Sequence, residues 1–243
     1  MKRWLKQNSI WIAGFVFVCI LAIAEIRFVN PSVKDALGWA GVLVSTFVGA
    51  AVAFMFNSFR SRQERIDQEC AAGNLALITL VELLDRMLQY QHSFVKKASG
   101  KPDAWFAMRA GEMTDVELKI EKNSLAFLLE DYPMTWRSIV LEEMRYSTFK
   151  NAVNLRNKLM NESVWPKLEA AGLKHGASII AAQVEEILGP ATTQNLKGAT
   201  EHIIGNCEKN IASLTTCIAT LRKVLLELYP YREFVRVPKK LDV

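Results

Sequence analysis

The longest apolar stretch in the sequence runs from Leu37 to Phe56, twenty residues without a charge. As a helix it covers about 30 Å, the hydrocarbon thickness of a bilayer, so it predicts a membrane-spanning helix. Small residues recur on it at every fourth position, which favours close packing against another helix. That helix is either the neighbouring span or the same span of a second subunit. The small residues are Gly41, Ser45, Gly49 and Ala53.

A shorter apolar run, Ile10–Ala24, precedes this stretch, and flanking apolar residues lengthen it to about residues 10–28. Asn30-Pro31-Ser32 then predicts a tight turn. Residues 1–57 are therefore expected to form a transmembrane hairpin, and residues 58–243 a separate domain. The alternative is a secretory signal cleaved after Ala24, because a basic start and an apolar centre precede a small-x-small sequence.

Basic residues are concentrated outside the predicted hairpin loop, which holds only Arg27 and Lys34. Lys and Arg beside short loops are retained in the cytoplasm, so both termini are predicted to be cytoplasmic and the protein to be a two-pass inner-membrane protein. These basic residues are also the predicted contacts to the membrane surface. They are Lys2, Arg3 and Lys6 before the first span and Arg60, Arg62 and Arg65 after the second.

After Ser58 the apolar spacing follows the helical period, with almost no strand pattern. The predicted fold is all-α: the hairpin, then a long stalk helix, then an antiparallel helical bundle. The helix over 114–130 is predicted from a capping box at Thr114 and Glu117, and Thr192 or Thr193 is expected to cap the last helix. The predicted helices are about 60–97, 114–130, 135–161, 178–188 and 193–229, with a break at Trp165-Pro166.

Residue type divides the predicted helix 135–161 into a core face and a solvent face. The core face comprises Ile139, Val140, Met144, Phe149, Val153, Leu155 and Leu159. The solvent face comprises Glu142, Arg145, Lys150, Arg156 and Lys158.

Charge and cysteine usage exclude several classes of function. The first 57 residues hold five of the 30 Lys and Arg residues and two of the 25 Asp and Glu residues, which leaves 25 against 23 for the rest of the chain. This balance does not favour sequence-specific DNA binding. The four cysteines show no metal-ligand spacing, so we expect reduced or buried thiols, no metal and no cofactor. The last residues, from Tyr229 to Lys240, mix aromatic and basic side chains and predict either a solvated tail or contact with an anionic surface.

The nearest approach to a catalytic motif is Arg86 followed by His92. This spacing resembles the Arg/His motif of HEPN ribonucleases, and the resemblance implies RNA cleavage by that pair in a dimer. Six positions along an unbroken helix rotate by about 600°, so the two side chains are expected on different faces. A solvated arginine and a partly exposed histidine are the alternative.

A basic start, two spans and a helical cytoplasmic domain together resemble the two-transmembrane effectors of bacterial anti-phage systems, such as those associated with retrons. The resemblance implies a toxin that is held inactive until a signal is received and then damages the inner membrane. It also implies membrane lipids as contacts, and a second copy or a cytoplasmic protein or ribonucleoprotein as partner. A membrane-tethered scaffold and a HEPN-like ribonuclease are the other hypotheses, so enzymatic activity stays open.

Overall fold

The computed structural model describes residues 34–113, 119–173 and 180–236, and the chain divides into two compact units, Met1–Ile66 and Asp67–Val243. The described residues are all-α and contain no strand. The first predicted span, the hairpin turn, and Lys2, Arg3 and Lys6 lie outside the described residues. The helices are α2 (Lys34–Tyr90), α3 (Lys96–Ala98), α4 (Ala104–Ala107), α5 (Leu128–Asp131), α6 (Pro133–Leu159), α7 (Trp165–Ala170), α8 (Ala181–Leu188) and α9 (Pro190–Leu228).

Helix α2 begins at Lys34 and continues without interruption to Tyr90, so the predicted span and the predicted stalk belong to one helix. Helical structure then continues through a π-helix, Gln91–Val95, and α3. The predicted end near Lys97 is confirmed. The division between the two units lies after Ile66, later than the boundary predicted after residue 57.

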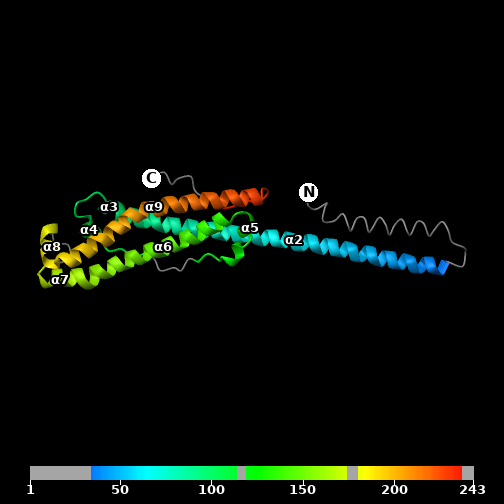
Figure 1. The fold of residues 1–243 in the computed structure, drawn as a ribbon, viewed down its shortest axis with the longest axis horizontal. Helices are drawn as coiled ribbons and strands as arrows, with labels where there is room; N and C mark the ends of the chain where they lie inside the picture. Colours follow the sequence, from blue (N-terminus) through cyan, green and yellow to red (C-terminus); the bar gives the residue numbers. More distant parts are fainter. Residues whose placement is uncertain (1–33, 114–118, 174–179, 237–243) are drawn as a thin grey trace. The chain divides into compact units, whose positions relative to one another are not determined.

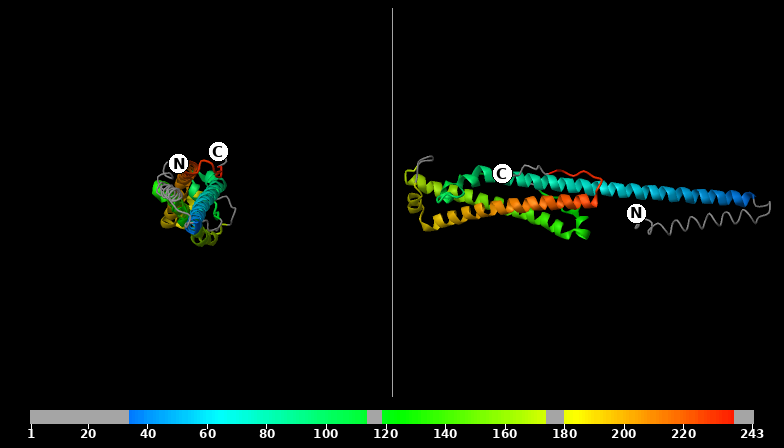
Figure 2. Two further views of the ribbon diagram at one scale, coloured as in Figure 1. Left: turned by 90° about the vertical axis from the view of Figure 1, so that its right-hand side faces the viewer. Right: turned by 90° about the horizontal axis from the view of Figure 1, so that it is seen from above.

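The long helices of the second unit form its core. They are the residues of α2 from Asp67 onward, α6 and α9 (Figures 1 and 2). Buried residues on α6 recur at alternating intervals of four and three, a heptad spacing that packs side chains as in coiled coils. They are Thr135, Ile139, Glu142, Tyr146, Phe149, Val153, Arg156 and Met160, the last just beyond the helix.

The facing helices keep the same spacing, so the core is a continuous seam. On α2 the buried set includes Cys70, Leu77, Leu80, Leu84, Met87 and Gln91. On α9 it includes Thr193, Leu196, Thr200, Ile203, Cys207, Leu214, Cys217, Leu221 and Val224.

A second apolar cluster closes the end of this unit where α4, α7 and α8 lie (Figure 1). Trp105 of α4 joins it, and the Lys197 ammonium lies 5.3 Å from the centroid of the Trp105 ring. The buried members are Trp105, Met160, Val164, Leu168, Val184, Leu188 and Leu196.

Several sequence predictions for this unit were wrong. The predicted capping box, Thr114 and Glu117, lies outside the described residues. From Lys119 onward, the described residues form a 3-10 turn, Asn123–Leu125, and the short α5 in place of the predicted helix to residue 130. Helical structure is not interrupted at Trp165-Pro166. A π-helix, Met160–Val164, precedes α7 and accommodates Pro166, which has no backbone N–H to donate. Helix α9 begins at Pro190 after Gly189, so neither Thr192 nor Thr193 caps it.

The predicted faces of α6 were partly wrong as well. Met144 and Leu155 are exposed by 59% and 66%, although they were assigned to the core. Glu142 and Arg156, assigned to solvent, are exposed by only 4% and 1%. The heptad seam decides which positions are buried, whatever residue type stands there.

Candidate functional site

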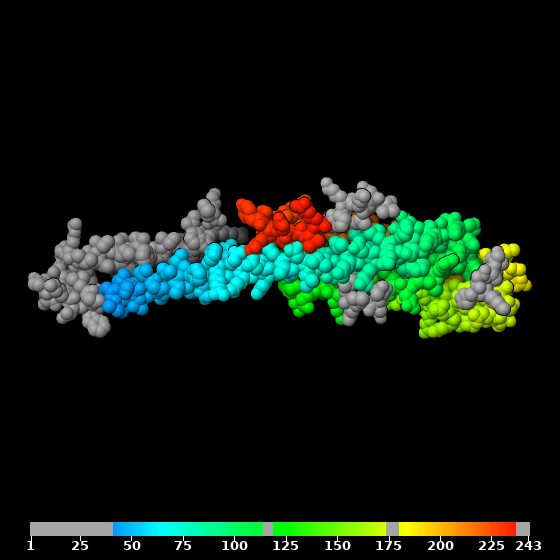
Figure 3. Space-filling view, turned by 180° about the vertical axis from the view of Figure 1, so that it is seen from behind, coloured from blue at the N-terminus to red at the C-terminus, as the bar shows by residue number. Residues whose placement is uncertain are grey.

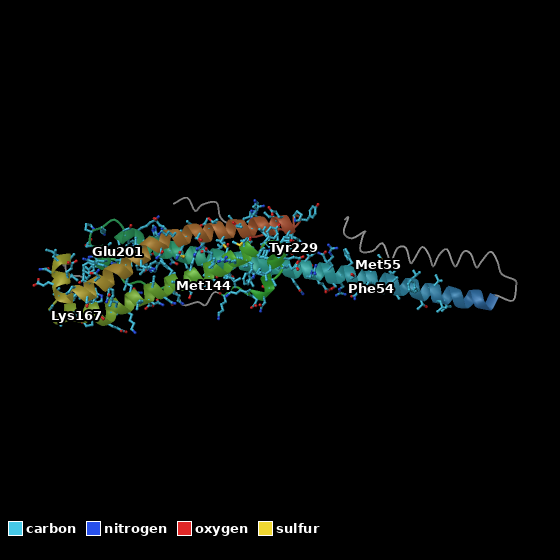
Figure 4. The ribbon with its side chains drawn as sticks, in the orientation of Figure 1. Phe54, Met55, Met144, Lys167, Glu201 and Tyr229 are labelled. Atoms are coloured by element: carbon cyan, nitrogen blue, oxygen red, sulfur yellow. The ribbon has the colours of Figure 1, made fainter. Side chains whose placement is uncertain are left out.

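From Gly41 onward, the apolar part of α2 in the first unit is largely exposed. Within the described residues, one helix is long and apolar enough to cross a membrane, and no part of its most apolar window is buried. Large side chains there face outward, and Figure 4 shows Phe54 and Met55 standing out from the helix. An aqueous solvent would disfavour this much uncovered apolar surface, whereas lipid would not.

The four small residues of this stretch are exposed too. A Cβ atom built on Gly41 or Gly49 would meet nothing within 4 Å. The hydroxyl of Ser45 donates to the Val42 carbonyl over 2.9 Å, so its polar group is satisfied within the helix. Within the described residues, nothing covers the small-residue face.

The basic residues that follow the apolar stretch are exposed on the next turns of α2. Arg60 pairs with Glu64 at 2.8 Å, an i,i+4 pair in which both side chains are largely solvated. Arg62 and Arg65 are exposed as well. An exposed pair of this kind contributes little to stability, so the Arg60 guanidinium can turn to a charged surface at little cost.

The structure gives Arg86 and His92 different surroundings. His92 is exposed on the π-helix that follows α2. Arg86 is half-buried beside Tyr146; burial raises the pKa of the Tyr146 phenol, and the positive charge of Arg86 opposes that rise. Arg86 therefore has a packing role against α6, and cleavage of RNA by this pair stays a prediction.

A groove of about 290 Å³ lies between α6 and α9. At its floor, the buried Glu142 carboxylate accepts hydrogen bonds from Arg145 over 2.6 Å and from the Ser213 hydroxyl. Most other groove residues carry hydroxyls, a consequence of small polar side chains at or beside the heptad positions. The lining comprises Thr135, Ser138, Leu141, Glu142, Arg145, Ser213, Thr216, Cys217 and Thr220.

A second polar layer crosses the core at Arg156. Its Nε atom donates to Thr200 Oγ1 over 2.8 Å, and its Nη2 atom donates to the carbonyls of Trp105 and Met108 over 3.2 and 2.5 Å. These partners are all neutral, and burial lowers the pKa of the guanidinium while the nearby Tyr90 opposes that shift. Arg156 thus links α6, α9 and the segment that carries α4.

The neighbouring Asn157 extends this layer by donating to the Gly111 carbonyl over 2.9 Å. Gly111 lies so close to Phe94 that a Cβ atom would come within 2.2 Å of the ring. A residue without a side chain is therefore required where this segment crosses the π-helix.

Three cysteines lie within the described residues, and all three are buried free thiols, as predicted: Cys70, Cys207 and Cys217. Burial raises the pKa of Cys207 and of Cys217 to about 12. Thiols of this kind are poor nucleophiles, so neither is suited to covalent catalysis. In the described part of the chain, no group of three or more potential metal ligands is found.

Sequence reasoning found the apolar segment and its basic flank but missed both polar layers. The missed signal is the 4-3 spacing itself, since Glu142 and Arg156 occupy heptad positions on α6. Comparison of the chain with family models, curated proteins and solved structures finds no match.

Proposed function

We propose that this protein is an integral inner-membrane effector whose helical domain receives a signal and whose transmembrane helices associate to perturb the membrane. One observation carries the proposal: α2 is a single helix that contains both an exposed apolar stretch of spanning length and buried heptad positions of the bundle. A change in the bundle would therefore act on the same helix that meets the lipid.

In this proposal the chain crosses the membrane twice and both termini are cytoplasmic. The support is the distribution of charge, because Arg60, Arg62 and Arg65 follow the α2 span while the predicted outer loop holds Arg27 and Lys34. Anionic lipid headgroups attract such a cluster by about 1 kcal/mol for each basic residue near the surface.

Association is assigned to the face formed by Gly41, Ser45, Gly49 and Ala53. Close packing of small residues stabilises helix pairs in lipid, where no hydrophobic effect drives association. The proposed partner is a second copy of this chain, and the proposed signal comes from a cytoplasmic protein or ribonucleoprotein. The proposed architecture resembles that of the retron-type effectors described above.

The test is expression in a bacterial host with a membrane-potential dye. The wild-type chain should depolarise the membrane and slow growth. Gly49→Leu, which places a bulky side chain on the small-residue face, should lose most of this effect. Ala50→Leu adds similar bulk on another face of the same exposed helix and is the matched control.

Two outcomes would contradict the proposal. A membrane-tethered scaffold explains the protein better if two chains reach the membrane and neither depolarises it. The two chains are the wild type and a chain from which the signal-receiving domain is removed. If Gly49→Leu and Ala50→Leu weaken depolarisation equally, the small-residue face has no special role.

A further inference from the structure

The described residues that follow α9 are fastened to the start of the second unit. Helix α9 stops at Leu228, before Pro230, and the residues that follow lie against α2 (Figure 3). The Tyr229 hydroxyl donates to the Glu69 carboxylate, and Arg232 forms an ion pair with Asp67. Residues 229–236, named here the C-terminal segment, therefore turn back beside the α2 residues that follow the first unit.

Asn74 of α2 binds the backbone of this segment with both ends of its side-chain amide. Its Nδ2 atom donates to the Glu233 carbonyl over 3.4 Å, and its Oδ1 atom accepts from the Val235 amide over 3.1 Å. From α9, Arg222 donates to the Val235 carbonyl over 3.2 Å. An extended backbone presents these groups without competition from helical hydrogen bonds, so the contact depends on the non-helical conformation.

One side chain anchors the segment in the core. Phe234 is 6% exposed, and its ring centroid lies 6.4 Å from that of Tyr229. The Arg232–Asp67 ion pair lies at the surface, since the two residues keep 41% and 53% of their side chains exposed. Exposed ion pairs are weak, so the burial of the Phe234 ring contributes more to the attachment than this ion pair does.

We propose that the C-terminal segment is a detachable clasp that holds α2 against α9 and whose release uncovers the α2 surface around Asp67–Asn74. This goes beyond the proposed membrane activity, because it concerns a conformational change inside the second unit. Segments with few buried apolar contacts open at lower free energy than the heptad core, which allows local release without global unfolding.

Cys70 is a native reporter for this release. It lies on α2 between the clasp contacts Glu69 and Asn74 and is only 8% exposed. Arg232 is close enough for its charge to act on the Cys70 thiol. Cys207 and Cys217 lie deeper in the seam on α9, so they report global unfolding in the same molecule.

The experiment is maleimide labelling of the full chain in detergent micelles, with each cysteine quantified by peptide mass spectrometry. In the wild type, Cys70 should label faster than Cys207 and Cys217. Phe234→Ala and Asn74→Leu should each accelerate Cys70 labelling at least tenfold and leave the other two unchanged. Asn206→Leu is the matched control, because the half-buried Asn206 amide lies away from the clasp contacts and donates within its own helix, to the His202 carbonyl.

A synthetic peptide with the sequence of residues 229–236 separates release from misfolding. Added in millimolar excess to the Phe234→Ala variant, it should slow Cys70 labelling again, whereas the same peptide with alanine for phenylalanine should not. The clasp is overturned if both variants leave Cys70 labelling unchanged. It is also overturned if all three thiols accelerate together and the peptide has no effect.

Discussion

The guanidinium of Arg156 donates a hydrogen bond to the Thr200 hydroxyl over 2.8 Å, and each residue is 1% exposed. Glu142 lies fourteen positions before Arg156 on α6. It accepts a hydrogen bond from Ser213, which lies thirteen positions after Thr200 on α9. The residue numbers of the two pairs add to 356 and 355, as an antiparallel alignment requires. Both polar layers therefore fix the same register between α6 and α9, because a shift of either helix would leave buried polar groups unpaired.

Thr200→Val should destabilise the protein by about 1–3 kcal/mol, since the variant keeps the shape of the side chain and leaves a buried guanidinium nitrogen without its acceptor. Urea unfolding of the full chain followed by circular dichroism measures this change. Thr216→Val is the control: Thr216 is exposed and bonds only within its own helix, to Ala212. If the two variants lower the free energy of unfolding equally, Arg156 is not a register contact.

Glu142→Leu should leave stability unchanged or raise it. Leucine suits a heptad core position, Arg145 is half-exposed and can turn to solvent, and the small Ser213 keeps access to the groove. The urea midpoint should not fall below that of the wild type. A loss of more than about 1 kcal/mol would show that the carboxylate stabilises the fold beyond setting its register.

Gly111→Ala should destabilise the protein by about 1–3 kcal/mol, because the added Cβ atom overlaps the Phe94 ring. Gly205→Ala is the opposite case on α9, where an added Cβ atom meets nothing within 4 Å. There we expect a gain of about 0.5–1 kcal/mol from helix propensity. Thermal unfolding tests both expectations: the melting temperature should fall for Gly111→Ala and rise for Gly205→Ala.

Stability should fall as pH rises above about 9. Burial raises the pKa of Cys207 and Cys217 from 9.0 to about 12, so the folded state holds protons that the unfolded state releases between these values. The contribution of the two protonated thiols to the free energy of unfolding is complete below pH 9 and is lost as pH approaches 12. Urea midpoints at pH 8 and pH 10 test this. Cys207→Ala combined with Cys217→Ala should reduce the difference between them, and an unchanged difference would contradict the assignment.

Residue pattern predicted the parts of this molecule that depend on apolar spacing alone. The stretch Leu37–Phe56 lies within one helix, and the predicted end of the helix over 178–188 at Leu188 is confirmed. Predictions from residue type were wrong where tertiary contacts decide burial. Arg156 is buried because its acceptors include carbonyls about fifty residues earlier in the chain. The contacts of the C-terminal segment were equally hidden, because Asn74 and Val235 are 161 positions apart.

The central claim is that α2 anchors the chain in a membrane, and extraction at alkaline pH tests it most directly. Membranes from cells that express the full chain are washed with sodium carbonate, which removes peripheral proteins. The full chain should stay in the membrane pellet, and a chain reduced to residues 67–243 should appear in the supernatant. Release of the full chain by carbonate would contradict the account, because the exposed apolar surface of α2 would then have to be covered by protein and not by lipid.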